Sequence, residues 1–224
     1  MAGGCTREMP RAPEGWRRTI RNARTRIRKG KTDAAIAMLL PALRWRYDTA
    51  RNEAVALLGS TERAAETLLD TLRSAETAVE RRAAADALGL MKSRRAVPPL
   101  VHALRDPNMI VRRSASLALL RLRATESVAP IANLLRDESG GVRVMAANVL
   151  GRFADRAAAP ALIRAMRDGK WYVRQAAARA LGELRDPRGV PALRKARADP
   201  RPAVARAAGE ALSAISLHTS RRRP

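Results

Sequence analysis

The sequence predicts an all-α fold: an α-solenoid (superhelix) of about six helical hairpins, with a basic helix before the first hairpin. The main observation is a repeat, because Val111, Val142, Val173 and Val204 follow one another at intervals of 31 residues. Each of these valines is followed by alanine after four residues and by leucine after eight. Hydrophobic residues make up 46% of the chain and aromatic residues only 3%, which suits closely packed helices with small side chains. A sustained period of this length is typical of stacked helical units.

The chain is expected to begin with a disordered segment and a basic helix. Residues 1–13 are rich in glycine and proline, which disfavour regular structure. In residues 14–31, Trp16, Ile20 and Ile27 recur at helical spacing and share one face of an amphipathic arm. The other faces of this arm are basic. The arm residues expected to contact a polyanion are Arg17, Arg18, Arg21, Arg24, Arg28, Lys29 and Lys31.

The solenoid itself is expected over residues 32–215. Each clear repeat holds two apolar helical segments joined by a short turn that opens with an acidic residue. Neither helix can bury its apolar face alone, so each repeat packs against its neighbours. Residues 216–224 do not continue the 31-residue period, and we expect them to form a basic tail. The expected repeats cover residues 32–59, 60–91, 94–122, 125–153, 156–184 and 187–215, of which the first two are degenerate.

The chain carries an excess of positive charge that points to an acidic partner. Its formal net charge is +23 at pH 7. Residues 1–31 hold ten basic and two acidic side chains, and residues 94–215 hold 23 and ten. Codon bias exchanges lysine for arginine but does not create a twofold excess of bases over acids. Such an excess implies self-repulsion that a polyanion would relieve, with a charge that merely reflects composition or serves solubility as the alternative.

The repeated pattern resembles the HEAT repeat. It reads Pro-x-Leu, then Leu-Arg-Asp, then Val-Arg-x-x-Ala-x-x-Ala-Leu-Gly, and the last part is complete at residues 173–182. The pattern is most similar to the HEAT-like repeats of phycobilisome lyases, clearly in residues 94–215 and weakly in residues 32–93. This resemblance implies the solenoid fold and little about function, because the family includes scaffolds, transport adaptors, chromophore lyases, a hydroxylase and DNA-repair proteins.

The resemblance also implies a structural role for two sets of charged residues. In HEAT-like repeats, the aspartate of the turn and the arginine after the valine usually form a ladder of hydrogen bonds between neighbouring repeats. Arg51 is a further candidate in the first repeat. Ala205 replaces the arginine in the last repeat, where no following repeat needs it. The expected ladder residues are Asp106, Asp137, Asp168, Asp199, Arg112, Arg143 and Arg174.

Few residues could support catalysis, so we expect a non-catalytic protein without a cofactor or metal. The two histidines are His102, at an outward position of a first helix, and His218 in the tail. They build no Cys–His, Ser–His–Asp or metal-binding set. The hydroxylase relatives hold iron through His-Glu pairs, which this sequence lacks. A HEAT-like DNA glycosylase is a remote alternative, because such enzymes need only a basic groove, aromatic residues and an acid.

Binding is expected on the second helices, which line the concave face of HEAT-type solenoids. Positions two, six and ten residues after each valine avoid the apolar stripe, and basic residues outnumber acidic ones there. The first helices are basic as well, so the sequence predicts a positive body rather than one sharply defined groove. For any single arginine, a solvated surface position is the alternative. The candidate polyanion-binding residues of the second helices are Arg113, Arg121, Arg152, Arg179 and Arg206.

Two aromatic pairs are candidates for contacting a partner. Trp45 and Tyr47 alternate with arginines, which suits stacking on nucleobases, and the alternative is that Trp45 covers the core of the first repeat. Trp171 and Tyr172 lie in a turn, where they either pack over the adjacent repeat or stay exposed as an anchor for a protein. The arm has three interpretations: a cap on the end of the solenoid, an RNA- or DNA-binding segment, or a helix on a membrane surface.

The sequence therefore predicts a non-catalytic protein that engages RNA, DNA or a ribonucleoprotein through arginines of its body and arm. Its affinity would depend strongly on salt and weakly on base sequence. The competing prediction is a scaffold or adaptor that holds an acidic protein. No stretch approaches the length of a membrane span and no signal peptide is evident, so a cytoplasmic location is expected. The sequence leaves the oligomeric state open.

Overall fold

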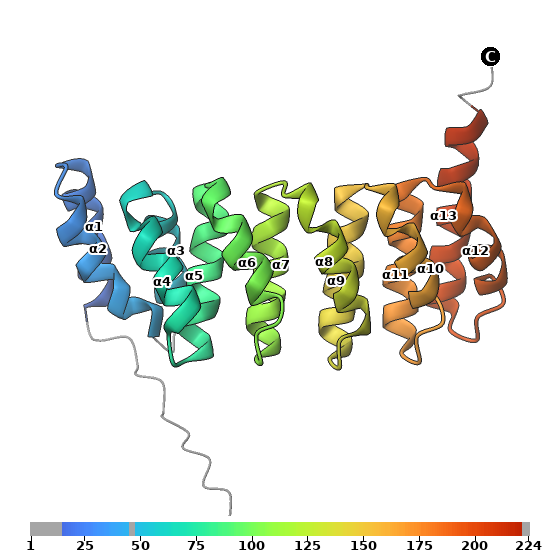
Figure 1. The fold of residues 1–224 in the computed structure, drawn as a ribbon, viewed down its shortest axis with the longest axis horizontal. Helices are drawn as coiled ribbons and strands as arrows, with labels where there is room; N and C mark the ends of the chain where they lie inside the picture. The colour runs from blue at the N-terminus through green and yellow to red at the C-terminus, as the bar shows by residue number, and fades with distance from the viewer. Residues whose placement is uncertain (1–14, 45–47, 221–224) are drawn as a thin grey trace, which may run out of the picture. The chain divides into compact units, whose positions relative to one another are not determined.

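The computed structural model describes residues 15–44 and 48–220, which form helices joined by short turns (Figure 1). No strand occurs within these two ranges. The prediction of an all-α solenoid is confirmed by this architecture. The start predicted to be disordered, residues 1–13, lies outside the described residues, as do Trp45, Tyr47 and residues 221–224.

The chain divides into two compact units, residues 1–99 and residues 100–224, and each is described by itself. The α-helices of unit 1 are α1 (Trp16–Arg28), α2 (Thr32–Leu39), α3 (Asp48–Gly59), α4 (Ala65–Ser74) and α5 (Ala78–Met91). Helix α6 (Val97–Ala103) spans the boundary. The α-helices of unit 2 are α7 (Met109–Arg121), α8 (Val128–Asn133), α9 (Gly140–Phe153), α10 (Ala159–Ala165), α11 (Trp171–Leu184), α12 (Val190–Ala196) and α13 (Pro202–Ser220).

Short 3-10 helices adjoin most of the first helices of the hairpins. They turn the chain between one hairpin and the next, or close the end of a first helix. They are η1 (Leu40–Arg44), η2 (Glu62–Ala64), η3 (Arg94–Ala96), η4 (Thr125–Ser127), η5 (Leu134–Arg136), η6 (Arg156–Ala158) and η7 (Pro187–Gly189).

In unit 1 the basic arm is part of the packed body. Helix α1 lies against α2, and the apolar face of α1 is covered there. Ile20 is only 2% exposed and Ala23 is fully buried. The helix forms for the reason that the sequence indicates, since its apolar residues recur every three or four positions and Gly30 follows it at a positive φ. Of the three interpretations of the arm, this packing favours a helix that caps its neighbour.

In unit 2 the second helices α7, α9, α11 and α13 stand in series, and each packs against the next. The valines that mark the repeat are all fully buried, at positions 111, 142, 173 and 204. The first helices add one large buried side chain per hairpin, namely Ile131, Leu162 and Leu193. The 31-residue period thus corresponds to one hairpin, and the periodic apolar residues form the core between successive hairpins.

The end of the last hairpin differs from the predicted boundary at residue 215. Helix α13 continues to Ser220, so the first part of the predicted tail is helical. Ile215 is buried with 2% exposure, and no glycine or proline follows before residue 220 to stop the helix. A helix without such a stop signal extends beyond its packed part, which sequence periodicity alone does not reveal.

Close approach between successive second helices depends on small residues. A Cβ atom added to Gly151 would lie 3.0 Å from the Cα of Ala180, and one added to Gly182 would lie 2.9 Å from the Cα of Ala211. The backbones of α9, α11 and α13 therefore approach to distances that any larger side chain at these glycines would prevent.

We predict that Gly182→Ala destabilises the protein, whereas Gly209→Ala leaves it as stable or slightly more stable. At position 182 the new methyl group collides with backbone, and overpacking of this kind costs about 1–3 kcal/mol. At position 209 the methyl group would meet only the Arg197 side chain at 3.6 Å, so the gain in helix propensity of about 0.5–1 kcal/mol remains. Urea unfolding followed by circular dichroism measures both variants. Equal stability of the two would contradict the close approach.

Candidate functional site

An arginine–aspartate ladder links the hairpins of unit 2. Arg112 donates from Nε to Asp137 Oδ2 at 2.7 Å and from Nη2 to Asp137 Oδ1 at 2.8 Å. The same two-pronged geometry joins Arg143 to Asp168 and Arg174 to Asp199, one hairpin further each time. Bidentate pairs of this kind are among the strongest and most directional hydrogen bonds in proteins.

Each ladder residue also makes hydrogen bonds to the backbone of the turn in its own hairpin. The Nη1 atom of Arg112 donates to the carbonyl oxygens of Asp106 at 2.9 Å and Pro107 at 3.0 Å. Each turn aspartate accepts from the backbone N–H two residues later, as Asp137 does from Ser139 at 2.9 Å. The hydrogen-bonding groups of these side chains are therefore used for structure, and the ladder is not available to a ligand.

The ladder changes the acidity of its carboxyl groups. Burial alone would raise the pKa of Asp168, but hydrogen bonds from Arg143 and from the backbone of Lys170 outweigh it, and the pKa lies below its usual range. The hydrogen bond from Arg174 lowers the pKa of Asp199, and burial only partly opposes it. Both groups are thus held as carboxylates in the folded protein.

Unit 1 contains an arginine of the same kind that the sequence pattern did not reveal. Arg81 donates from Nη1 to the carbonyl oxygens of Ala75 at 2.8 Å and Glu76 at 3.1 Å, as Arg112 does in its own turn. A one-residue insertion hides the match, because Arg81 follows Val79 by two positions instead of one. Arg51, the candidate suggested by the pattern, is only 3% exposed, and burial lowers its pKa.

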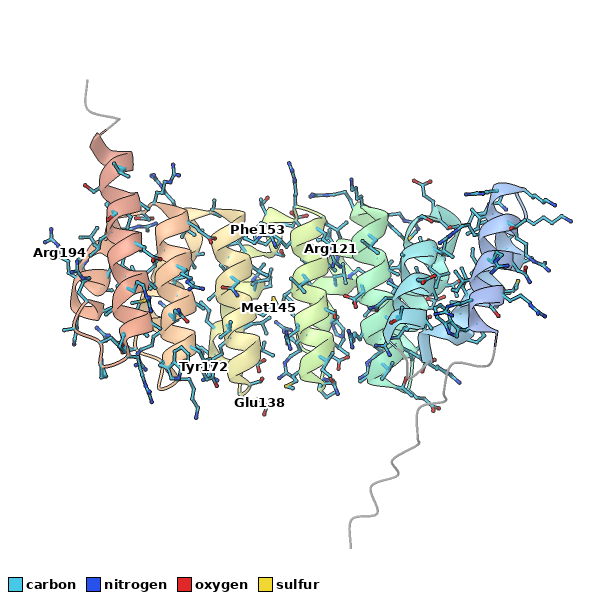
Figure 2. All side chains as sticks on the ribbon, turned by 180° about the vertical axis from the view of Figure 1, so that it is seen from behind. Arg121, Glu138, Met145, Phe153, Tyr172 and Arg194 are labelled. Atoms are coloured by element: carbon cyan, nitrogen blue, oxygen red, sulfur yellow. The ribbon has the colours of Figure 1, made fainter. Side chains whose placement is uncertain are left out.

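The candidate polyanion-binding residues of the second helices lie on the surface of unit 2, and Arg121 is labelled in Figure 2. All five are exposed: Arg113, Arg121, Arg152, Arg179 and Arg206. Apart from Arg121, none of them makes an ion pair with a carboxylate in the described part of the chain. Arg112 and Arg113 show the contrast, since one is buried in the ladder and its neighbour points to solvent.

The candidate residues of the arm are also exposed, but they belong to unit 1. They are Arg17, Arg18, Arg21, Arg24, Arg28, Lys29 and Lys31. The guanidinium of Arg17 lies 5.3 Å from the ring centre of Trp16, in cation–π contact. The structure thus places the predicted basic residues in two sets, one on each unit.

The aromatic pair of unit 2 packs against the preceding hairpin and is partly exposed, and its role as an anchor for a protein stays a prediction. Trp171 and Tyr172 are 39% and 38% exposed, and their rings meet edge to face at 5.8 Å. The Tyr172 hydroxyl lies over Gly140 of the preceding hairpin, where an added Cβ would come within 2.6 Å of it. Met109 and Ile110, at the same position of α7, are 46% and 40% exposed. Sequence reasoning missed this second apolar patch.

A groove of about 940 Å³ runs along the C-terminal parts of α9 and α11 and the middle of α13. Its floor consists of small residues such as Gly151, Gly182 and Ala211, and its sides carry Arg156, Arg179, Arg185, Glu183 and Glu210. Burial raises the pKa of Glu183, and the charges of Arg152 and Arg179 partly offset this shift. Arg156 and Arg185 fall outside the helical positions considered in the sequence, because they lie in the connection after each second helix.

The described residues contain no cluster of side chains that could hold a metal ion. No cluster of three or more histidine, cysteine, aspartate or glutamate side chains occurs in them. His102 is exposed, as its outward position predicts, and the side chain of His218 lies outside the described set. No helix in that part of the chain has the length and apolar content needed to cross a membrane.

Comparison with known proteins identifies the repeats. Residues 65–143 and 128–213 match the family model described as HEAT repeats. A designed armadillo repeat protein in complex with the peptide (KR)4 is similar with a TM-score of 0.58 and 17% identity, over 88% of this chain and 98% of that one. Human deoxyhypusine hydroxylase in complex with glycerol gives a TM-score of 0.40 at 22% identity, over 82% and 85%. The CpcE–CpcF complex of phycocyanin lyase from Nostoc gives a TM-score of 0.46 at 16% identity, over 97% of this chain and 98% of that one. No curated protein matches.

We predict that Arg112→Ala destabilises the protein by about 3 kcal/mol, because it leaves the Asp137 carboxylate buried without its partner. Both side chains are only 7% exposed. Arg113→Ala removes the same charge from the neighbouring exposed position and should change the unfolding free energy by less than about 0.5 kcal/mol. Urea unfolding is the suitable measurement, since urea does not screen charge. A similar loss for both variants would mean that the ladder does not hold the hairpins together.

We also predict that stability falls as the pH drops from about 5 to 3. The pKa values of Asp168 and Asp199 are lowered in the folded state, so the unfolded chain binds protons first, near the ordinary aspartate pKa of about 3.9. The contribution of the ladder is therefore complete above that pKa and lost below it. Urea midpoints at pH 6 and pH 3 measure the loss. The decrease in the urea midpoint between pH 6 and pH 3 should be smaller in Asp199→Asn. A decrease equal to that of the wild type would show that Asp199 does not contribute to the pH dependence.

Proposed function

The chain belongs to the HEAT-repeat family, and from that premise we propose that it is a non-catalytic binding protein whose arginine-rich surface engages a polyanion. The fold is a repeat scaffold suited to binding proteins. The observation that carries the proposal is the set of exposed arginines on the second helices of unit 2. Arg113, Arg152, Arg179 and Arg206 project from successive helices without a carboxylate partner among the described residues.

Unpaired guanidinium groups on adjacent helices favour an anionic partner over solvent alone. The three ladder arginines of unit 2 are matched by three aspartates and add nothing to the net charge of +23, so this excess comes from other side chains. Mutual repulsion of these cations is relieved when anions bind between them. RNA, DNA or a ribonucleoprotein supplies such anions in a regular array, and arginine contacts phosphate through paired hydrogen bonds. The exposed cations of α1 support the same proposal independently in unit 1.

An acidic protein segment is the second candidate, favoured by the groove of unit 2. The groove has a floor of small apolar residues between charged sides, which suits a peptide better than a sugar–phosphate backbone. The designed armadillo protein with a similar fold holds a peptide of alternating lysine and arginine. Here the exposed charge has the opposite sign, so the complementary peptide is acidic.

The groove of unit 2 does not bring together the parts that a glycosylase needs. Such an enzyme needs an aromatic side chain and an acid in one groove. Trp171 and Tyr172 begin α11, whereas Glu183 lies near its end, and 12 residues of helix separate them by roughly 18 Å. Figure 2 shows Tyr172 at one end of the second helices and Phe153 at the other. The aromatic pair and the carboxylate of the groove therefore cannot act on one nucleotide.

We predict that the triple variant Arg113→Gln, Arg152→Gln and Arg179→Gln weakens binding of a labelled 20-base-pair duplex at least tenfold at low salt. The magnitude of the slope of log affinity against log salt should fall by about 2 to 3, because up to three phosphate contacts are lost. The matched control replaces Arg136, Arg164 and Arg194, which are exposed on or beside first helices. Fluorescence anisotropy across a salt series measures both.

Equal loss in the two triple variants would contradict binding on the second helices. Wild-type affinity weaker than about 10⁻⁴ M at low salt for both the duplex and a single strand would refute the nucleic-acid candidate.

A further prediction separates the two candidates. If nucleic acid is the partner, Arg18→Gln, Arg21→Gln and Arg24→Gln in α1 weaken its binding more than Trp171→Ala with Tyr172→Ala does, whereas an acidic protein partner reverses the order. Substitution is preferable to deletion of the arm, since Ile20 and Ala23 are part of the core of unit 1. Circular dichroism confirms that each variant stays folded.

A further inference from the structure

We propose that the groove along α9, α11 and α13 is the docking site for an extended acidic peptide segment of a partner protein. This proposal rests on the proposed function, because it assigns one partner class to part of the same arginine-rich surface. It differs from that function in requiring a defined pocket with an apolar floor, rather than dispersed positive charge. All of the groove lies in unit 2.

The floor of the groove is shaped by close helix contacts. Gly151 lies against Ala180 and Gly182 lies against Ala211, so these two glycines add no side chain of their own to the floor, and the Glu183 carboxylate lies over Gly151. Ala214 continues this floor along α13. The volume of about 940 Å³ falls within the range of pockets that enclose a ligand or a few residues of a peptide. A small aliphatic side chain of a peptide fits such a floor.

The cations of the groove come from three segments of unit 2. Arg179 comes from α11 itself, and Arg156 begins η6, which follows α9. Arg185 is the C-cap residue of α11 and has a left-handed backbone with φ of 50°. None of the three arginines forms an ion pair with a carboxylate within the described ranges. Three unpaired guanidinium groups around one apolar floor fit a segment that alternates carboxylates with small side chains.

Glu183 acts as a built-in competitor for the arginines. Its carboxylate lies over Gly151 of the preceding helix, in a position where an added Cβ would collide with Oε2. Arg152 and Arg179 are its nearest charged neighbours, and Glu210 of α13 lines the same groove. A peptide carboxylate would compete with Glu183 for the positive charge of Arg179, with which Glu183 forms no ion pair. Glu183 therefore weakens binding of short or weakly acidic segments and favours densely acidic ones.

The lining favours a peptide over nucleic acid because it contains no aromatic side chain. Single-stranded nucleic acids are usually held by bases stacked on aromatic rings, and the exposed rings of α11 lie at the opposite end of that helix. A carboxylate-rich chain needs only cations and a floor for its backbone and small side chains. Both are present here.

The test uses the full chain and a fluorescein-labelled peptide of four Asp-Glu pairs, with a 20-nucleotide single strand as the second probe. Arg185→Gly removes one guanidinium from the groove and should weaken peptide binding about fivefold. Glycine is the preferred residue in a left-handed C-cap, so this variant stays folded. Arg123→Gly is the matched control, because Arg123 has the same backbone conformation, with φ of 51°, after α7 and does not line the groove.

A second variant changes shape without changing charge. Ala214→Leu fills part of the floor and should weaken peptide binding about tenfold, while Ala129→Leu at an exposed position of α8 has no effect. Glu183→Gln removes the competing carboxylate and should strengthen peptide binding about threefold. Anisotropy titrations at two salt concentrations give all of these affinities.

Each outcome separates the two proposals. If the peptide binds but Arg185→Gly matches Arg123→Gly and Ala214→Leu matches Ala129→Leu, the groove is not the docking site and the proposed function stands. If Ala214→Leu weakens the single strand and not the peptide, the groove takes nucleic acid and the peptide assignment is overturned. If the wild-type chain binds neither of these probes nor the duplex at low salt, both proposals fail together.

Discussion

The bidentate hydrogen bonds between an arginine of one hairpin and the turn aspartate of the next are the interaction on which unit 2 depends. Each arginine also holds the carbonyl oxygens of its own turn, and each aspartate holds a backbone N–H of its own turn. One pair of side chains thus fixes two turns and the distance between them. Because the same pair recurs three times, it sets the register of α7, α9, α11 and α13.

That register brings the second helices together at glycine and alanine. Gly151 meets Ala180 and Gly182 meets Ala211 only if successive helices are shifted by one constant step. The glycines and alanines at these contacts are small, and Gly151, Gly182 and Ala211 line the groove of unit 2 together with Glu183. The close helix contacts that the ladder sets therefore also shape the groove.

The ladder divides the arginines of unit 2 into two populations. Arg112 is buried and paired, whereas Arg113, the next residue, is exposed. Each ladder arginine is paired with an aspartate, so the ladder adds no net charge to the surface of unit 2. The excess charge belongs to the outward positions and to the connections after the second helices, where Arg156 and Arg185 lie. The proposed binding surface therefore consists of arginines next to the structural ones and not of the structural ones themselves.

The sequence by itself determined the fold class and the positions of the buried valines, because a hairpin that repeats every 31 residues must bury the same positions each time. It also indicated which arginines of the second helices point outward, since helical periodicity decides this locally. Only the tertiary structure decided where α1 packs, how far α13 extends, and that Tyr172 lies over Gly140. The sequence pattern did not reveal Arg81, because one inserted residue interrupts the period although Arg81 still makes the same hydrogen bonds to its turn. The groove could not be predicted either, because Arg156, Arg179, Arg185 and Glu183 converge from different elements. Their convergence depends on the distance and shift between neighbouring helices, which the period of the sequence does not specify.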